Sequence, residues 1–585
     1  MIHNDTACTA SYMIFIVFLL IHCSVARASS SRSILRSTDC QFSDLVRLRG
    51  GGEVGDSNND NNHDTDKKHV LHDDRDMASL LTWAKENGVF LSDDIRLEQD
   101  KQSGIWGVTS RLAYNVADDE RITFLYMPHN RVPVVGKAQQ RVGRMKVPND
   151  NNPNSTSYSN NNAGDFDCEN FGVVMRIPSE LVISSTMLKG IEYNNNVNVK
   201  PSSIQERVKG YLRQHYDDET ASFYYSHFSL VLVFLHEYSK GEKSLWYPYF
   251  HSLPKPPLQT VHYWNEREMN YARKLGLTNT FESAYREWEA FVVMLNEILP
   301  HATYDPDHVK WAFATCMTRA WKASYKASTG ESVYNLVCIA DMFNHRYYSN
   351  VMYEQDSVDS PVEMIQIDHD SDDDGLYMSY GNTNLARFPV IYGFCDTSCP
   401  TIPALIIINS FTDDSNILEA AKIFGFTSTD AMVLYTEDGA ISDRVWNAIL
   451  YRILLDELRK AQGSKERLRL IQSELDILYK ACRKKPQGPM IELLEGDEKD
   501  ALDHLHYKYR QEMIEDISWY VKVMLDSLPN PEEETKKILE DASGGENCTT
   551  SNWNMLREFN EHIRKTYLNV QEHMERVSEQ HKGQE

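Results

Sequence analysis

Hydrophobic and polar residues recur along this chain with two periods, that of a helix and that of a strand. Both periods occur in the first stretch that is predicted to fold. Residues 78–88 carry apolar side chains at helical spacing and predict a short amphipathic helix that Gly88 ends. Residues 104–108 and the alternating stretch 121–126 predict strands, and residues 171–183 predict a further strand. This part of the chain is therefore expected to be rich in β-structure.

Helical periodicity dominates the middle of the chain. An apolar run at residues 228–235 and the periodic stretches 281–299 and 306–322 predict helices. Residues 335–409 return to short β-branched and aromatic runs typical of strands. The pattern predicts a β-rich module that a helical insert interrupts at about residues 200–325.

Beyond residue 411 the pattern is almost wholly helical. Val445, Ile449 and Ile453 recur at four-residue steps, which places them on one side of a helix. A second stripe at helical spacing is formed by Leu468, Ile471, Leu475 and Leu478. Stripes of this kind usually form the core between packed helices, so residues 411–585 are expected to be a helical domain.

Composition and charge narrow the classes of function. The chain has 585 residues, 41% of them hydrophobic and 25% charged, as in globular proteins of more than one domain. Its formal net charge of -25 argues against binding nucleic acid, which needs a basic surface. The charge is compatible with a basic protein segment as partner.

The N-terminus carries a predicted targeting signal. Residues 12–21 form an apolar run of ten, about half the length of a membrane-spanning helix, and Ala26 and Ala28 supply a cleavage pattern. No later segment is apolar enough to span a membrane. We expect residues 1–28 to be a signal peptide, and the protein to enter the secretory route as a lumenal or secreted protein.

Residues 29–76 are expected to be a disordered or transit segment. Residues 29–52 are rich in Ser and Arg and poor in acidic residues, as organelle transit peptides are. A signal peptide followed by such a stretch resembles the bipartite presequence of secondary plastids, which is the alternative location. Presequences of that kind usually place Phe after the cleavage site, where this chain has Ser29. Residues 149–164 form an Asn-rich insertion inside the first domain.

Cysteines predict no metal site. Of the ten cysteines, Cys8 and Cys23 precede residue 28, which leaves eight. Cys395 and Cys399 are the only close pair, and no second pair of Cys or His follows at zinc-binding spacing.

Short phrases in a fixed order carry the chemistry. They are ADMFNH at residues 340–345, YGNTN at 380–384 and YGF at 392–394, preceded by GEKSLWYPY at 241–249 and by Thr318-Arg319. In this order and at this spacing they resemble SET-domain methyltransferases of the Rubisco large-subunit methyltransferase type. The resemblance extends from about Ala78 to the C-terminus.

The resemblance implies an α+β fold. The expected architecture is a β-rich SET domain with a helical insert and a pseudo-knot over residues 77–410, followed by an all-α substrate-binding domain over residues 411–585. It also implies an enzyme that transfers a methyl group from S-adenosylmethionine to a lysine of a protein substrate. Such a transfer depends mainly on holding two reactants in a narrow, desolvated channel.

The resemblance implies a role for each position of this chain that matches a site residue of the family. The resemblance implies two channel tyrosines, Tyr380 and Tyr392. It implies a donor site formed by Asn344, His345, Arg319, Asp341, Trp106, Gly107 and Phe394. The family usually has Gly-x-Gly in the donor loop and Ser or Thr after Asn-His, where this chain has Gly104-Ile-Trp-Gly107 and Arg346.

Two alternatives to a lysine methyltransferase stay open. One is a non-catalytic SET scaffold that binds a protein, and the other is a methyltransferase that acts on histidine. In each case we expect a monomer with a protein partner, no metal, no nucleic acid, and no membrane contact beyond targeting. The sequence names neither the substrate nor the number of methyl groups transferred.

Overall fold

A computed structural model describes most of the folded part of the chain. The described residues are 76–92, 95–99, 106–110, 173–191, 203–299, 304–327, 330–366, 375–381, 385–404, 432–483, 497–542 and 550–583. The predicted signal peptide, nearly all of the segment 29–76, the strand at 121–126, the insertion at 149–164 and Asn384 lie outside them. Within the described ranges, no helix has the length and apolar character needed to cross a membrane.

The fold begins with the predicted short helix. Helix α2 (Met77–Glu86) starts where the Asp76 carboxylate accepts a hydrogen bond from the backbone N–H of Ser79 at 2.9 Å. It buries Leu80 and Trp83 on one face, as the apolar spacing predicts.

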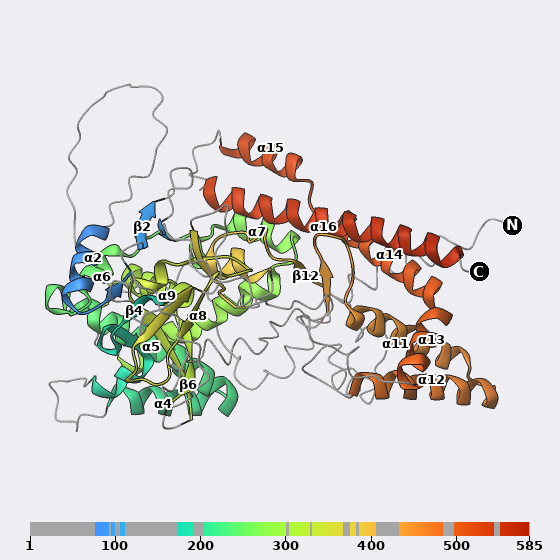
Figure 1. Ribbon diagram of the computed structural model, residues 1–585, viewed down its shortest axis with the longest axis horizontal. Coiled ribbons are helices and arrows are strands. Elements are labelled where there is room, and N and C mark those ends of the chain that lie inside the picture. The colour runs from blue at the N-terminus through green and yellow to red at the C-terminus, as the bar shows by residue number, and fades with distance from the viewer. Residues whose placement is uncertain are drawn as a thin grey trace, which may run out of the picture. The chain divides into compact units, whose positions relative to one another are not determined.

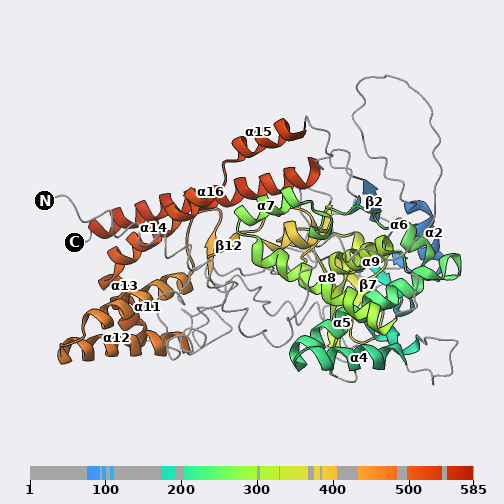
Figure 2. The same ribbon diagram turned by 180° about the vertical axis from the view of Figure 1, so that it is seen from behind.

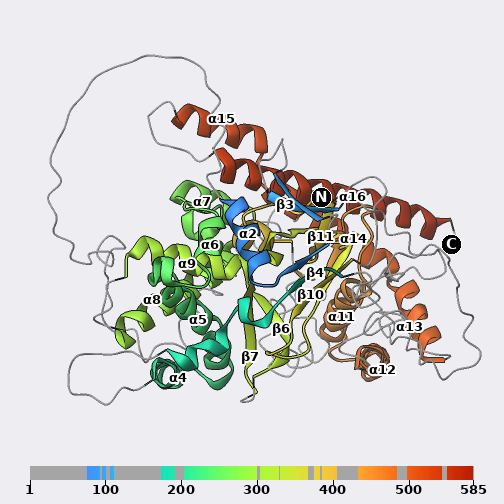
Figure 3. The same cartoon turned by 60° about the vertical axis from the view of Figure 1, so that its left-hand side comes forward.

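The larger sheet unites strands from both ends of the β-rich region (Figure 3). Its order is β1 (Phe90–Leu91), β4 (Val173–Ile177), β10 (Val362–Gln366), β9 (Val351–Glu354), β11 (Gly375–Met378), β3 (Trp106–Ser110) and β2 (Ile95–Gln99). The short β8 (Asn344–His345) pairs with β11 in parallel, with Asn344 opposite Tyr377 and His345 opposite Met378. A smaller sheet is formed by β5 (Val182–Ser184), β7 (Ser332–Val337) and β6 (Trp321–Lys326).

Helices fill the predicted insert (Figure 2). They are α4 (Ile204–His215), α5 (Asp218–Ser239), α6 (Tyr247–Ser252), α7 (Glu266–Lys274), α8 (Thr278–Ile298) and α9 (Pro306–Arg319). Side chains of Ser203, Asp217, Asn265 and Asp305 accept hydrogen bonds from N–H groups of the first turns of α4, α5, α7 and α9. Each of these helices therefore begins at a polar residue that can satisfy its unpaired donors.

Two of the predicted boundaries were wrong. The single strand predicted for residues 171–183 is broken at Pro178, after which a 3₁₀ turn, η2 (Ser179–Leu181), leads into β5. The helix predicted for residues 306–322 ends at Arg319, and Lys322 belongs to β6. Exposure alternates residue by residue along β6, a strand period that the helix prediction overlooked.

The C-terminal region is helical, as predicted (Figure 1). Its helices are α11 (Asp443–Lys460), α12 (Lys465–Arg483), α13 (Asp497–Lys508), α14 (Arg510–Ser527), α15 (Pro531–Ala542) and α16 (Thr550–Lys582). Val445, Ile449 and Ile453 are all buried on α11, which confirms the predicted stripe. A short strand, β13 (Val433–Tyr435), precedes α11 and pairs with β12 (Thr401–Pro403).

Two large hydrophobic clusters hold the described residues together. One contains α2, the larger sheet and much of the helical insert, and the other contains α7, η7 (Phe388–Tyr392) and the C-terminal helices. The ring of Tyr380 packs against both clusters. The chain is thus an α+β protein in which the segment after β11 lies where the two cores meet; the pseudo-knot stays a prediction.

Truncation of Phe234 on α5 tests the first cluster. This side chain is fully buried, with its ring centroid 4.9 Å from that of Phe250 and 5.3 Å from that of Trp311. We expect Phe234→Ala to lower the free energy of unfolding by about 3–5 kcal/mol, because it leaves a cavity. Phe223→Ala on the same helix, where the side chain is 46% exposed, should change it by about 0.5 kcal/mol or less. Urea unfolding measures both, and equal losses would contradict the assignment of the core.

Candidate active site

A buried ion pair fixes the turn that carries the Asn-His phrase. Arg319, the last residue of α9, donates from Nη1 to the carbonyl oxygen and to Oδ2 of Asp341, each at 3.0 Å. The Tyr249 hydroxyl donates to the same Oδ2 at 2.7 Å. The side chain of Asp341 is 0% exposed and that of Arg319 is 18% exposed. Arg319 therefore acts on the turn through Asp341.

The pKa values in this group reflect burial and opposite charge. Burial and the negative charge of Asp341 raise the pKa of Tyr249 well above its ordinary value. Burial is the largest single effect on Arg319 and lowers its pKa, yet Asp341 and Tyr249 together outweigh burial and raise the pKa of the guanidinium. The remaining oxygen of Asp341, Oδ1, is buried and has no hydrogen-bond partner among the described residues. The sequence resemblance implied Arg319 and Asp341 as donor-binding residues but gave no sign that the two residues and Tyr249 contact one another.

The turn begins with a strained residue. Ile339 is fully buried and has a φ of 72°, a positive value that β-branched residues rarely adopt. A 3₁₀ turn, η6 (Ala340–Met342), follows and leads directly into β8. Strain of this kind persists only where the surroundings over-determine the backbone, and the Arg319 contacts to Asp341 supply that restraint.

The side chain of Asn344 contacts strand β3. Its side-chain Nδ2 donates to the carbonyl oxygen of Trp106 at 3.2 Å. A Cβ atom on Gly107 would lie 2.7 Å from that Nδ2, so any larger residue here would displace the Asn344 amide. The indole Nε1 of Trp106 is buried and has no partner in the part of the chain that the structure describes. Trp106, Gly107 and Asn344 are thus brought together as predicted.

His345 presents its backbone to the surface and its ring to the interior. The residue is partly exposed, yet its side chain is only 1% exposed. Nε2 lies 3.0 Å from Oδ2 of Asp396, and Nδ1 lies 3.0 Å from the backbone nitrogen of Tyr380. The ring also stacks on Phe388, with centroids 4.6 Å apart. Both ring nitrogens therefore have protein partners, which leaves the backbone as the part of His345 that a ligand can reach.

The predicted tyrosines lie together. The ring centroids of Tyr380 and Tyr392 are 5.1 Å apart, and Phe394 lies 6.2 Å from Tyr392 and 5.9 Å from His345. The Tyr380 hydroxyl donates to the carbonyl oxygen of Phe343 at 2.9 Å. The Tyr392 hydroxyl makes no hydrogen bond to another residue that the structure describes. Burial raises the pKa of both phenols, so both stay protonated at neutral pH.

A glycine between Tyr392 and Phe394 allows the chain to turn. Gly393 has a φ of 79°, and a Cβ atom there would lie 2.9 Å from the backbone carbonyl carbon of Gln259. Its N–H donates to the carbonyl oxygen of Phe388 at 2.9 Å, which closes the π-helical turn η7. The Tyr-Gly-Phe phrase is therefore a local structural requirement as well as a source of site residues.

Sequence patterns missed Asp396 and Phe388, which contact His345. Asp396 stands between the two cysteines noted above, and no spacing relates it to residues 340–345. Phe388 looks like any apolar core residue. Only the fold brings these segments together, 51 residues apart in the case of Asp396 and His345.

Substitution of Gly107 tests the close approach of β3 to Asn344. In Gly107→Ala the new methyl group would displace the Asn344 amide and break its bond to Trp106, lowering the free energy of unfolding by about 1 kcal/mol. Gly210→Ala on α4 meets no atom within 4 Å and should be neutral or stabilising. Urea unfolding of both variants checks this, and a neutral Gly107→Ala would refute the contact.

The pH dependence of stability tests the environment of Asp396. Burial raises the pKa of this carboxyl group, but hydrogen bonds from His345 and Ser398 outweigh it and hold the pKa below its ordinary value of 3.8. A lowered folded-state pKa stabilises the protein fully above about pH 5, and that stability is lost as the pH falls through the folded-state value. The difference in unfolding free energy between the unmodified protein and Asp396→Asn should therefore decrease as the pH falls below about 4, by the same linkage. A difference independent of pH would exclude a lowered pKa.

Comparison with known proteins yields structural likeness only. No protein-family model matches the chain, and no curated protein is similar to it in sequence. Among solved structures, the chain is similar to the SET domain of LSMT bound to lysine and AdoHcy, at 14% identity and a TM-score of 0.47, over 86% of this chain and 92% of that chain. Rubisco LSMT bound to AdoMet is similar at 14% identity and a TM-score of 0.46, over 85% and 91% of the two chains. Both alignments span most of this chain at low sequence identity.

Proposed function

We propose that this protein is an S-adenosylmethionine-dependent methyltransferase that acts on a lysine side chain of a protein. The observation that carries the proposal is the meeting of the Asn344–His345 strand with Tyr380 and Tyr392 at one point of the fold. The sequence resemblance assigns donor binding to the first pair and the methyl channel to the second. Residues predicted for one site from distant phrases thus contact one another.

The residues around Asn344 fit an adenosine-type donor. Close backbone approach at Gly107, an unpartnered buried indole N–H on Trp106 and the accessible backbone of His345 offer polar groups beside an aromatic surface. Trp106, Gly107, Asn344 and the backbone of His345 would hold the donor. When bound, S-adenosylmethionine supplies an electrophilic methyl group.

The tyrosines would orient the acceptor and would not act as bases. Both phenols are protonated at neutral pH, because burial raises their pKa values. The Tyr380 hydroxyl is committed to the Phe343 carbonyl oxygen, whereas the Tyr392 hydroxyl is available to contact the acceptor nitrogen. Burial away from water disfavours an ammonium ion, so a lysine would lose its proton to solvent on entry.

Binding of the donor separates this proposal from a non-catalytic scaffold. Titration calorimetry should detect S-adenosylmethionine binding to the full chain, and Asn344→Ala should weaken it by roughly tenfold or more through the lost contact. Absence of heat with correctly folded protein would favour the scaffold. Mass spectrometry of proteins methylated in a lysate then identifies the acceptor, and modified peptides that lack lysine would favour histidine.

Removal of one hydroxyl tests the methyl channel. Tyr392→Phe keeps the ring packing and removes the group proposed to contact the acceptor, so turnover should fall roughly 10- to 100-fold while donor affinity stays nearly constant. Tyr507→Phe on α13, where the side chain is 49% exposed, is the matched control and should change neither. Equal losses of turnover and donor affinity in Tyr392→Phe would refute the assigned role.

A further inference from the structure

Asp396 lies in the loop that follows the Tyr-Gly-Phe phrase, and both of its carboxylate oxygens are bonded. Oδ2 lies 3.0 Å from His345 Nε2. Oδ1 accepts hydrogen bonds from Ser398, from the backbone N–H at 3.0 Å and from the hydroxyl at 2.5 Å. The Cys399 N–H donates to the Asp396 carbonyl oxygen at 3.3 Å and closes the turn. The side chain is 6% exposed, so the carboxylate is held in a fixed direction away from solvent.

These contacts define the tautomer of His345. Tyr380 has only an N–H to offer at Nδ1, so Nδ1 must be the unprotonated acceptor. The proton of the neutral ring is then on Nε2, where it donates to Asp396. A proton on Nδ1 would place two N–H donors face to face at 3.0 Å. Asp396 and the Tyr380 backbone thus select the same tautomer from opposite sides of the ring.

His345 in turn holds the backbone of Tyr380 in place. The backbone N–H of Tyr380 is bound to the imidazole, and the hydroxyl of Tyr380 is bound to the carbonyl oxygen of Phe343. Phe343 and Asn344 directly precede His345, so the ring of Tyr380 spans the segment that the donor would contact. A displaced imidazole would release the tyrosine backbone and the exposed backbone of His345 together.

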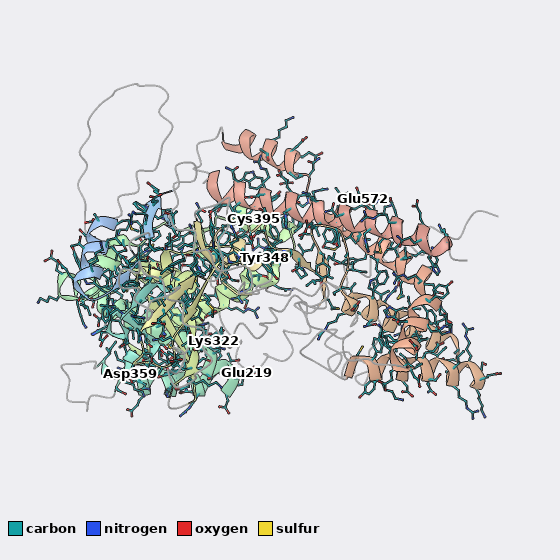
Figure 4. All side chains as sticks on the ribbon, in the orientation of Figure 1. Glu219, Lys322, Tyr348, Asp359, Cys395 and Glu572 are labelled. Atoms are coloured by element: carbon teal, nitrogen blue, oxygen red, sulfur yellow. The ribbon has the colours of Figure 1, made fainter. Side chains whose placement is uncertain are left out.

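The loop of Asp396 also faces the helical region. Helix α16 brings His562 near Asp396 and Glu558 near Cys395, which is labelled in Figure 4. Burial lowers the pKa of His562, and the charge of Asp396 opposes this effect. The titratable groups around the carboxylate are therefore His345 from β8, His562 from α16, and Cys395 and Cys399 from its own loop, where Ser398 also bonds to it.

We propose that Asp396 is a positioning residue of the methyl-transfer site, which acts through His345. Its carboxylate holds the imidazole in the Nε2–H form, and the imidazole holds both Tyr380 and the backbone of residues 344–345 in place for donor binding. The effect on donor binding rests on the proposed function, whereas the effect on the tautomer does not. Asp396 itself touches neither reactant.

The first experiment needs no ligand. In the full chain labelled with ¹⁵N-histidine, the His345 signals are identified by their loss in His345→Gln. We expect a protonated Nε2 and an unprotonated Nδ1, with the Nε2 proton protected from exchange with solvent. In Asp396→Ala that protection should be lost, whereas Asp396→Asn should retain it in part, because its amide oxygen still accepts a hydrogen bond. A proton on Nδ1, or an unchanged spectrum in Asp396→Ala, would overturn the proposal.

The second experiment measures binding of S-adenosylhomocysteine by calorimetry. Asp396→Ala should weaken binding roughly tenfold or more, as expected for a lost buried contact to a charged group, and Asp396→Asn should weaken it less. The control is Glu474→Gln on α12, where a carboxylate of similar burial binds Tyr509 at 2.8 Å. That variant should lose thermal stability without losing affinity. Equal effects of Glu474→Gln and Asp396→Ala on affinity would mean that Asp396 has only a structural role.

The two experiments separate two kinds of failure. If the unmodified protein does not bind S-adenosylhomocysteine, the proposed function fails, and the ¹⁵N spectra still decide the part of the proposal that concerns the tautomer. If it binds and Asp396→Ala binds equally well, the positioning role is wrong while the function stands.

Discussion

The imidazole of His345 needs a partner for each of its nitrogens in a place that water does not reach, and the site is built around that need. A buried polar atom without a partner costs free energy comparable to a lost hydrogen bond. His345 meets the requirement with Asp396 and the backbone of Tyr380, which come from separate segments. One turn earlier, Oδ2 of the buried Asp341 is bound by Arg319 and Tyr249. Two buried polar side chains thus set the positions of the segments from which the site is made.

Aromatic rings shield from water the parts of the imidazole that its hydrogen bonds do not cover. Tyr380, Phe388 and Phe394 surround the imidazole and exclude water from it, and Tyr392 packs against Tyr380. The same rings surround the tyrosine hydroxyls and keep them protonated. Apolar packing therefore has a chemical effect here, because it determines which groups can exchange protons and which can only orient a partner.

Local patterns in the sequence predicted much of this arrangement. The helix from Met77, the buried stripe of Val445, Ile449 and Ile453, and the grouping of Asn344 with Gly107 all follow from spacing or from ordered phrases. Patterns failed where a tertiary contact decides the outcome. Asp396 has no signature until the fold places it on His345, whereas the breaks at Pro178 and after Arg319 were local signals that the predictions overlooked. Such contacts are properties of the assembled core.

The position of Tyr380 between the two hydrophobic clusters ties the site to the helical region by thermodynamic linkage. Helix α16 contributes Phe559 and Ile563 to the cluster that supports Tyr380, Tyr392 and Phe394. A transient opening of α16 would expose part of the apolar surface on which these rings rest. Any ligand that requires the rings in place must then bind the closed form more tightly and reduce the frequency of opening by the same factor. Slow hydrogen exchange along α16 would therefore report that the site is occupied.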